Sequence, residues 1–207
     1  MKFAATLAMA VFLTSGCRNP AADKPRATVE APKSGPTMES GGEDRTYAFD
    51  GEGSKIGFVG AKVTGKHDGG FGKFSGTVTV PDGSVEGARV DVEIDMSSIW
   101  TDTDKLTGHL LSPDFFDVAN HPVAGFASTG ISKAGDGTYT VTGNLKLHGV
   151  EKSISFPAAI ELGDGSASAR GEFSIDRRDF GIVYPGMPDD LIKDDVLIKL
   201  GIEAKAE

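Results

Sequence analysis

The sequence predicts an all-β fold in which about eight strands share one core. Glycine is frequent, at 28 of 207 residues, and glycine weakens helix interiors but serves turns and close backbone approaches. From residue 46 onward, apolar and polar residues alternate with a period of two in several segments, which is typical of strands with one buried face. Turn signals separate these segments, as at Pro81-Asp82-Gly83, Gly135-Asp136-Gly137 and Gly163-Asp164-Gly165.

The alternation locates the individual strands. It is clearest at 88–95, 138–147 and 196–202, where every second residue is apolar or small. Shorter strands are expected at 54–63, 73–80, 123–131, 153–162 and 167–176. Eight such strands, with too little helix to cover them, must turn their apolar faces toward one another. A closed antiparallel barrel and a sandwich both satisfy this requirement.

One segment, 98–122, breaks the strand pattern. A helix is expected over 104–111, because Leu106 and Leu110 are four residues apart and lie on one side. Ser112 and Pro113 then predict the start of a second short helix, which carries Phe115 and Phe116. This helical insert would either plug the core or gate the mouth of a barrel.

The N-terminus has the features of a secretory signal peptide over residues 1–16. A single lysine precedes an apolar run that is too short to span a bilayer, and small residues follow it. Cys17 comes directly after them, which resembles the lipobox of bacterial lipoproteins, although Thr14 stands where Leu is usual. That resemblance implies acylation of Cys17, and Arg18 in the next position favours the outer membrane. The alternative is an ordinary signal peptide with an incidental cysteine.

Residues 17–45 are rich in Pro and Gly and poor in apolar side chains, which predicts a disordered tether. Such a tether would have a reach of about 30 Å. Residues 46–207 then form a single domain, attached to the membrane through the N-terminal acyl anchor alone.

Several function classes are disfavoured. A net charge of -9 argues against a nucleic-acid-binding protein, and one cysteine permits neither an internal disulfide nor a Cys-rich zinc site. The spacing of Gly60, Gly65 and Lys66 matches a phosphate-binding loop, but His67 replaces the hydroxyl residue and no helix is expected to follow. No nucleophile elbow occurs. We therefore expect no catalytic residues, no cofactor and no enzymatic activity.

The polar candidates have structural alternatives. The four histidines, His67, His109, His121 and His148, lack the spacing of a metal site, and hydrogen bonding is their expected role; His148 is expected on the polar face of its strand. Arg177-Arg178-Asp179 could bind an anionic head group or form a local ion pair.

Residues 46–207 resemble the YceI-like family of bacterial envelope proteins. The segments that carry the resemblance run in family order and are Ser54-Lys55-Ile56-Gly57-Phe58, His67-Asp68-Gly69-Gly70-Phe71-Gly72-Lys73-Phe74-Ser75-Gly76, Ser98-Ile99, His109-Leu110-Leu111-Ser112-Pro113-Asp114-Phe115-Phe116-Asp117, His121-Pro122, Phe126-Ala127-Ser128-Thr129, Gly143-Asn144-Leu145-Lys146-Leu147-His148-Gly149-Val150 and Arg178-Asp179-Phe180-Gly181-Ile182. One departure is Leu106-Thr107, where many members carry an Arg-Asp pair; any polar role of that pair is in doubt in this chain.

The resemblance implies a single antiparallel eight-stranded lipocalin-like β-barrel that binds a long apolar lipid, such as a polyisoprenoid, an isoprenoid quinone or a fatty amide. Together with the alternation, it leads us to expect small side chains that leave space inside, namely Gly143, Ala169 and Gly171. It also leads us to expect large side chains at the lining or mouth, namely Phe58, Phe71, Phe74, Ile99, Leu106, Leu110, Phe115, Phe116, Phe126, Leu145 and Phe173. His109 and Arg178 are the expected polar groups at the mouth.

Three hypotheses follow, and they differ in what fills the barrel. The first is a non-enzymatic lipid carrier or sequestering protein of the periplasm, in which the barrel is hollow. The second is an envelope stress or interaction module with a packed core and no ligand, because eight-stranded barrels can fill with side chains. The third is an enzyme that acts near His109 or His148. A dimer is compatible with each of them.

Overall fold

The structure, a computed structural model, describes residues 19–35 and 44–207. The expected signal peptide and Cys17 therefore lie outside the described residues. Eight strands form a closed antiparallel ring in which each pairs with the next and the last pairs with the first. In ring order they are β2 (Arg45–Asp50), β5 (Phe74–Val80), β6 (Arg89–Asp95), β8 (Val123–Lys133), β9 (Tyr139–Leu147), β10 (Val150–Leu162), β11 (Ser166–Asp176) and β14 (Asp195–Ala206). The expected closed barrel is confirmed.

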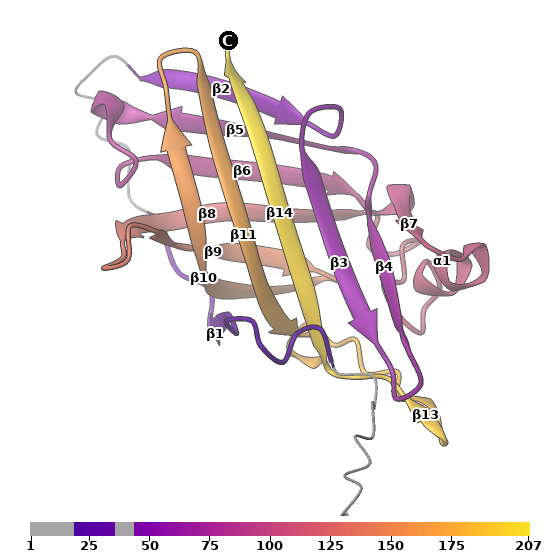
Figure 1. Cartoon of the computed structure of the whole chain (residues 1–207). Coiled ribbons are helices and arrows are strands. Elements are labelled where there is room, and N and C mark those ends of the chain that lie inside the picture. The colour runs from indigo at the N-terminus through magenta and orange to yellow at the C-terminus, as the bar shows by residue number, and fades with distance from the viewer. Residues whose placement is uncertain (1–18, 36–43) are drawn as a thin grey trace, which may run out of the picture.

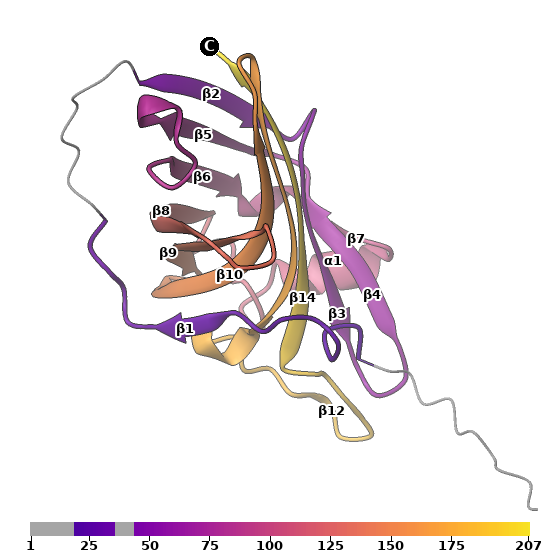
Figure 2. The same ribbon diagram turned by 60° about the vertical axis from the view of Figure 1, so that its left-hand side comes forward.

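The closing seam of the barrel is short. Strand β14 pairs with β11 along its whole length, but with β2 only at its C-terminal end, through Lys205 with Ala48 and Ala206 with Tyr47. The other half of β14 pairs instead with β3 (Lys55–Ala61). Strand β3 pairs with β4 (Lys66–Phe71), and β4 pairs with β7 (Ile99–Thr101); we call these three strands the branch. Figures 1 and 2 show this branch beside β14, while β2, β5 and β6 cross at a steep angle.

Sharp corners in the chain connect the branch with the ring. Only residues 51–54 separate β2 from β3, Gly72 and Lys73 separate β4 from β5, and the 3-10 turn η2 (Met96–Ser98) joins β6 to β7. Each of these chain segments thus contributes one strand to the ring and one to the branch. The branch extends one end of the barrel, beyond the seam.

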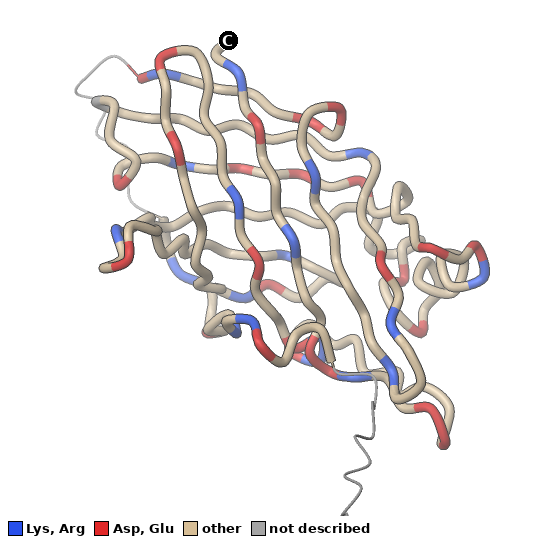
Figure 3. Tube along the Cα trace, in the orientation of Figure 1, with Lys and Arg blue, Asp and Glu red and all other residues tan. Residues whose placement is uncertain are grey.

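The alternating apolar residues face the interior. Phe126 lies opposite Val92 on β6 and Leu145 on β9, and Phe156 stacks on Phe173 with ring centroids 4.2 Å apart. Tyr47 and Phe180 are fully buried. Polar and charged side chains take the outward positions of the same strands, and Figure 3 shows both signs of charge distributed over them.

Two glycines permit close packing of aromatic rings against the sheet. A Cβ on Gly143 would lie 2.3 Å from Cζ of Phe126, and a Cβ on Gly69 would lie 2.5 Å from Cζ of Phe58. Any side chain at either position would displace the ring above it. The expectation that Gly143 leaves free space is therefore wrong, because the ring of Phe126 occupies that space.

All eight expected strands are present, but one lies outside the ring. The segment expected at 54–63 is β3, in the branch, whereas the ring strand β2 was not predicted. Strands β4 and β7 were also missed. Strand β4, Lys66-His67-Asp68-Gly69-Gly70-Phe71, has little apolar alternation because two glycines stand where side chains would signal it.

The helical insert is shorter than expected. Helix α1 (Asp104–Leu110) confirms the first helix. The second helix, predicted to start at Ser112, is wrong: residues 111–120 form turns, apart from short breaks. The hydroxyl of Ser112 donates a hydrogen bond to the carbonyl of His109 at the end of α1, so it does not cap a new helix. Asp117 has a left-handed backbone, with φ of 45°, which also ends helical geometry there.

The prediction of a disordered tether over 17–45 is wrong for residues 19–35. Strand β1 (Thr28–Glu30) pairs with β10, and Ala27 and Pro25 form backbone hydrogen bonds with Ser174 on β11. Ala21 and Ala27 are buried. This segment is a strap along the outside of the barrel, visible below β10 in Figure 2. Within the described residues, no helix is long and apolar enough to span a membrane.

Candidate functional site

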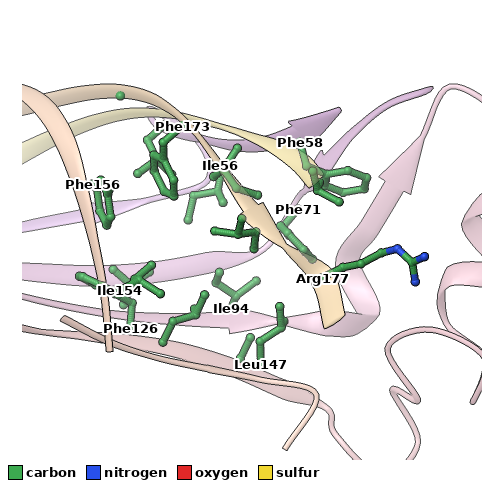
Figure 4. Close-up of a pocket in the computed structure, with 18 of the residues that line it drawn as sticks. Ile56, Phe58, Phe71, Ile94, Phe126, Leu147, Ile154, Phe156, Phe173 and Arg177 are labelled. Carbon is green, nitrogen blue, oxygen red and sulfur yellow. The ribbon is translucent and has the colours of Figure 1, made fainter. Parts of the chain in front are cut away.

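The barrel encloses a cavity of about 410 Å³, and its walls are almost entirely apolar. Inward-facing residues from every strand of the ring except β5 contribute to it, together with the branch strands β3 and β4 and helix α1. Figure 4 shows aromatic and aliphatic side chains converging from opposite walls, with Phe156 and Phe173 toward one side and Phe58 and Phe71 toward the other.

The structure places nine of the eleven expected lining residues on the cavity wall: Phe58, Phe71, Leu106, Leu110, Phe115, Phe116, Phe126, Leu145 and Phe173. The small residues Ala169 and Gly171 also line it. The other two expected residues, Phe74 and Ile99, do not lie on the cavity wall. Phe74 is buried in the main apolar core, and Ile99 packs with Leu110 in a second cluster.

Helix α1 and the turns after it close one end of the cavity. Leu106 and Leu110 line the cavity from the helix, and Phe115 and Phe116 line it from the turns. Leu110 and Phe115 are buried in the second cluster together with Ile182. These apolar contacts favour the plug over a loosely held gate.

His109 lies outside the cavity wall, contrary to its expected place at a polar mouth. Its ring makes edge contacts with Phe115 and Tyr184, at centroid distances of 4.9 and 5.1 Å. Its Nε2 is 2.9 Å from a carboxylate oxygen of Asp114. His109 therefore supports the plug from outside.

Arg177, rather than the expected Arg178, borders the cavity. Its side chain is 7% exposed, and it donates hydrogen bonds to the carbonyls of Ile182 and Lys193 and to a carboxylate oxygen of Asp194. Burial lowers the pKa of this guanidinium from its ordinary value. Figure 4 shows its head directed away from the apolar side chains, so the stem lines the cavity while the charge lies at its end.

Arg178 has the local ion-pair role. It donates two side-chain hydrogen bonds to Asp176, and Arg26 from the N-terminal strap donates another. The hydrogen bonds from Arg178 outweigh burial and lower the pKa of Asp176 to about 2. This network fixes the turn that positions Arg177.

The other basic residues on the cavity wall are paired with carboxylates. Lys62 pairs with Asp190, His67 with Asp102, and Arg170 with Glu203. Their side chains are about one-third to three-quarters exposed, so they mark the rim of the cavity and not its interior.

Two features of the structure concern the histidines. Among the described residues, no group of three or more His, Cys, Asp or Glu side chains could hold a metal ion. His148 does not lie on a strand as expected. It follows β9 in a turn with φ of 51°, its Nδ1 is 3.0 Å from the carbonyl of Phe180, and its ring meets His121 edge-on.

Sequence reasoning missed several lining residues. Phe49, Ile56, Ile154, Phe156, Ile198, Leu200 and Ile202 all lie on the wall. The period-two pattern contained the signal for most of them, because each stands an even number of positions from an apolar residue of the same strand that was predicted to face inward. What the pattern could not supply is which inward side chains meet a void and which meet one another.

The cavity can hold an apolar chain by burial alone. Its volume falls within the range of about 300–1,000 Å³ that is typical of ligand pockets. Within the described residues, the wall offers charge only at the end and rim.

Proteins with the name UPF0312 are similar to this chain in sequence. A UPF0312 protein of Pseudomonas putida (strain W619) is 32% identical over 142 residues, which cover 65% of this chain and 73% of that protein. A UPF0312 protein of Pseudomonas syringae pv. tomato has the same identity over the same length.

Solved structures share the fold. Burkholderia cenocepacia BcnA matches with a TM-score of 0.67 and 25% identity, over 76% of this chain and 99% of that one. A polyisoprenoid binding domain from Saccharophagus degradans matches with a TM-score of 0.63 over 78% and 98%; at 18% identity, it shows the fold alone.

The model of the YceI-like domain matches residues 47–204, which begin in β2 and end in β14 and so span the whole barrel. The chain belongs to the YceI-like family.

Proposed function

We propose that this protein is a non-enzymatic carrier or sequestering protein for a long-chain apolar lipid in the bacterial cell envelope. The observation that carries the proposal is the apolar cavity of about 410 Å³ inside the barrel. The same cavity argues against the packed-core alternative. The similarity to a polyisoprenoid binding domain supports a polyisoprenoid; an isoprenoid quinone or a fatty amide would fit the same walls.

The cavity size sets the expected ligand and affinity. If a methylene group takes about the volume of a water molecule in the liquid, roughly 30 Å³, the cavity holds on the order of 15 carbons. Burial of such a chain contributes roughly 12 kcal/mol before binding costs. Subtraction of at least about 4 kcal/mol for lost freedom gives a dissociation constant of about 1 μM or weaker. Longer polyisoprenoids would extend beyond the cavity.

Two matched glycines provide a test. Gly60 lines the cavity and a Cβ there would have no atom within 4 Å, whereas Gly201, on β14, has equally open space but lies outside the cavity wall. We expect Gly60→Phe to weaken binding of an offered polyprenol, quinone or fatty amide at least about tenfold, because the ring would take the ligand's place. Gly201→Phe should bind like the parent. Equal binding by both variants would contradict a ligand site inside the barrel.

We also propose that the protein is secreted across the inner membrane and attached to the outer membrane by acylation of Cys17. The support is the order of apolar run, small residues and cysteine at the N-terminus. Two or more acyl chains would give stable attachment. Metabolic labelling with a clickable fatty acid should mark the parent chain and not Cys17→Ala; an unlabelled parent chain would contradict the attachment.

A further inference from the structure

Exposed apolar side chains gather at one end of the molecule. Val63, Met187 and Leu191 are 50%, 62% and 49% exposed and lie on two neighbouring hairpins. Val63 is in the turn between β3 and β4, and the other two are in β12 (Gly186–Met187) and β13 (Asp190–Leu191). We call these three residues the apolar tip. Val183, which is 66% exposed, precedes β12 on the same segment.

Polar contacts hold the two hairpins together. The amide of Val63 donates a hydrogen bond to the carbonyl of Leu191, Lys62 forms an ion pair with Asp190, and the amide and hydroxyl of Thr64 donate to the same carboxylate. The polar groups thus bind the hairpins to each other and the apolar side chains remain in solvent. Exposed apolar residues on a braced element are typical of an interaction surface.

The apolar tip borders the cavity. Ala61 and Lys62, just before Val63, line the cavity, and so does Ile192, just after Leu191. Ile192 also forms a bridge with Lys62. A partner bound at the tip would therefore lie against the end of the lipid-sized cavity.

The position of the N-terminal strap indicates that this partner is a membrane. Ala21 is buried against Val59 and Leu197, on β3 and β14. Val59 precedes Val63 by four residues, which corresponds to roughly 13 Å of extended chain. The described chain begins two residues before Ala21, at Asn19, and the indigo start of the strap lies toward the end of the molecule that carries β13 (Figure 1).

The 18 residues before Asn19 in the sequence contain the apolar run Phe3 to Leu13 and Cys17. Either the apolar run or acyl chains on Cys17 would partition into a membrane. In both cases this segment precedes Asn19, which begins the strap close to the apolar tip. Cys17 stands two residues before Asn19 in the sequence, so an anchor at Cys17 would hold this end of the barrel near the bilayer.

The charges near the apolar tip are balanced. Lys62 is paired with Asp190, and the chain segments that flank the tip carry Lys66 and Lys193 as well as Asp189 and Asp194. Figure 3 shows both signs at this end of the molecule. Attachment here would depend on apolar insertion and not on attraction to anionic lipids.

We propose that the apolar tip inserts into the interfacial layer of a lipid bilayer and turns the adjoining end of the cavity toward the membrane. This docking goes beyond the proposed function and does not require an occupied cavity. It places the barrel axis at a defined orientation, with the β10–β11 turn at the far end of β14, away from the bilayer.

Site-directed fluorescence tests the orientation. The full chain with Cys17→Ala receives a single new cysteine, either Met187→Cys at the tip or Asp164→Cys in the fully exposed β10–β11 turn, and each is labelled with an environment-sensitive dye. Vesicles of phosphatidylcholine, with or without a nitroxide-labelled lipid, are then added. We expect the dye at 187 to shift to shorter wavelength and to be quenched by the nitroxide lipid, while the dye at 164 is unaffected.

Three results would overturn the proposal: no vesicle binding, a vesicle-bound chain with both dyes in water, or a dye at 187 that is already shielded without vesicles. The last result would indicate that the chain's own apolar run covers the tip. As a second measurement, Met187→Asp combined with Leu191→Asp should reduce vesicle partitioning about tenfold or more without a change in thermal unfolding, because both sites are exposed. Unchanged partitioning would also contradict insertion.

Discussion

At the level of single residues, the size of each inward side chain decides where the barrel is hollow. Gly60 stands on the cavity wall beside open space, and Ala169 and Gly171 also line the wall, whereas the space beside Gly143 is filled by the ring of Phe126. The parity of these residues could be predicted from the alternation in the sequence. The difference between the glycines could not, because it depends on which aromatic ring lies on the neighbouring strand.

The space beside each glycine predicts how well it tolerates a larger side chain, and Gly143 and Gly201 should differ. Gly143→Val should destabilise the protein by about 1–3 kcal/mol, because its Cβ would clash with Phe126 and with the carbonyl of Ala127. Gly201→Val should stay within about 0.5 kcal/mol of the parent, because nothing lies within 4 Å of its Cβ. Urea unfolding measures both values. Equal stability of the two variants would refute the ring-over-glycine packing.

Asp176 should control part of the acid stability. Its folded-state pKa of about 2 lies below the unfolded value of 3.8, so its contribution is present above about pH 4 and is lost as pH falls toward 2. The shift corresponds to about 2 kcal/mol. We expect Asp176→Asn to lose about this much stability at pH 7 and to show a shallower decline between pH 4 and pH 2. Urea unfolding at several pH values across that range measures the decline. If the variant loses as much stability as the parent between pH 4 and pH 2, another carboxylate is responsible.

At the level of elements, the N-terminal strap is the largest departure from expectation. Its composition is that of a linker, and its strand β1 has only three residues, so no periodicity could reveal it. Its attachment depends on two buried alanines and on backbone hydrogen bonds to β11, which composition does not register. The long ring strands, by contrast, carry enough alternating residues for prediction from sequence.

Hydrogen exchange tests the strap directly. The amide of Ala27, bonded to the carbonyl of Ser174, should exchange at least about tenfold more slowly than in an unstructured peptide. Ala27→Asp should remove this protection, because it would bury a charge. The matched variant Ala22→Asp changes an exposed alanine in the same segment and should preserve it. Unprotected amides throughout residues 19–35 in the parent would contradict the strap and support the prediction of a disordered tether.

The corners between the ring and the branch explain why the sequence predicted eight strands but took β3 for a barrel strand and missed β2. Tyr47 and Phe49 alternate with polar residues, but β2 has only six residues and was hidden by the adjoining linker composition. The corners at 51–54 and at Gly72 are set by chain geometry between strands, and sequence periodicity describes strands only. Prediction of the candidate site succeeded for large inward side chains and failed for Arg177, whose role depends on the turn held by Asp176.

At the level of the whole molecule, an apolar cavity, a plugged end and an apolar tip belong to one barrel. Leu110 and Phe115 are buried in the plug at one end of the cavity, and the tip lies beside a rim where charges are paired. Within the described residues, this arrangement gives the wall few means to recognise a polar head group. It favours a ligand selected by its apolar length.

Native mass spectrometry of the protein purified from its host, with solvent extraction of the same sample, tests the central claim most directly. The account predicts a complex heavier than the chain by the mass of one long-chain lipid, which the solvent releases, and a reduced or absent complex for Gly60→Phe. A bare chain mass for the parent, which also takes up no offered polyprenol, quinone or fatty amide, would contradict the account.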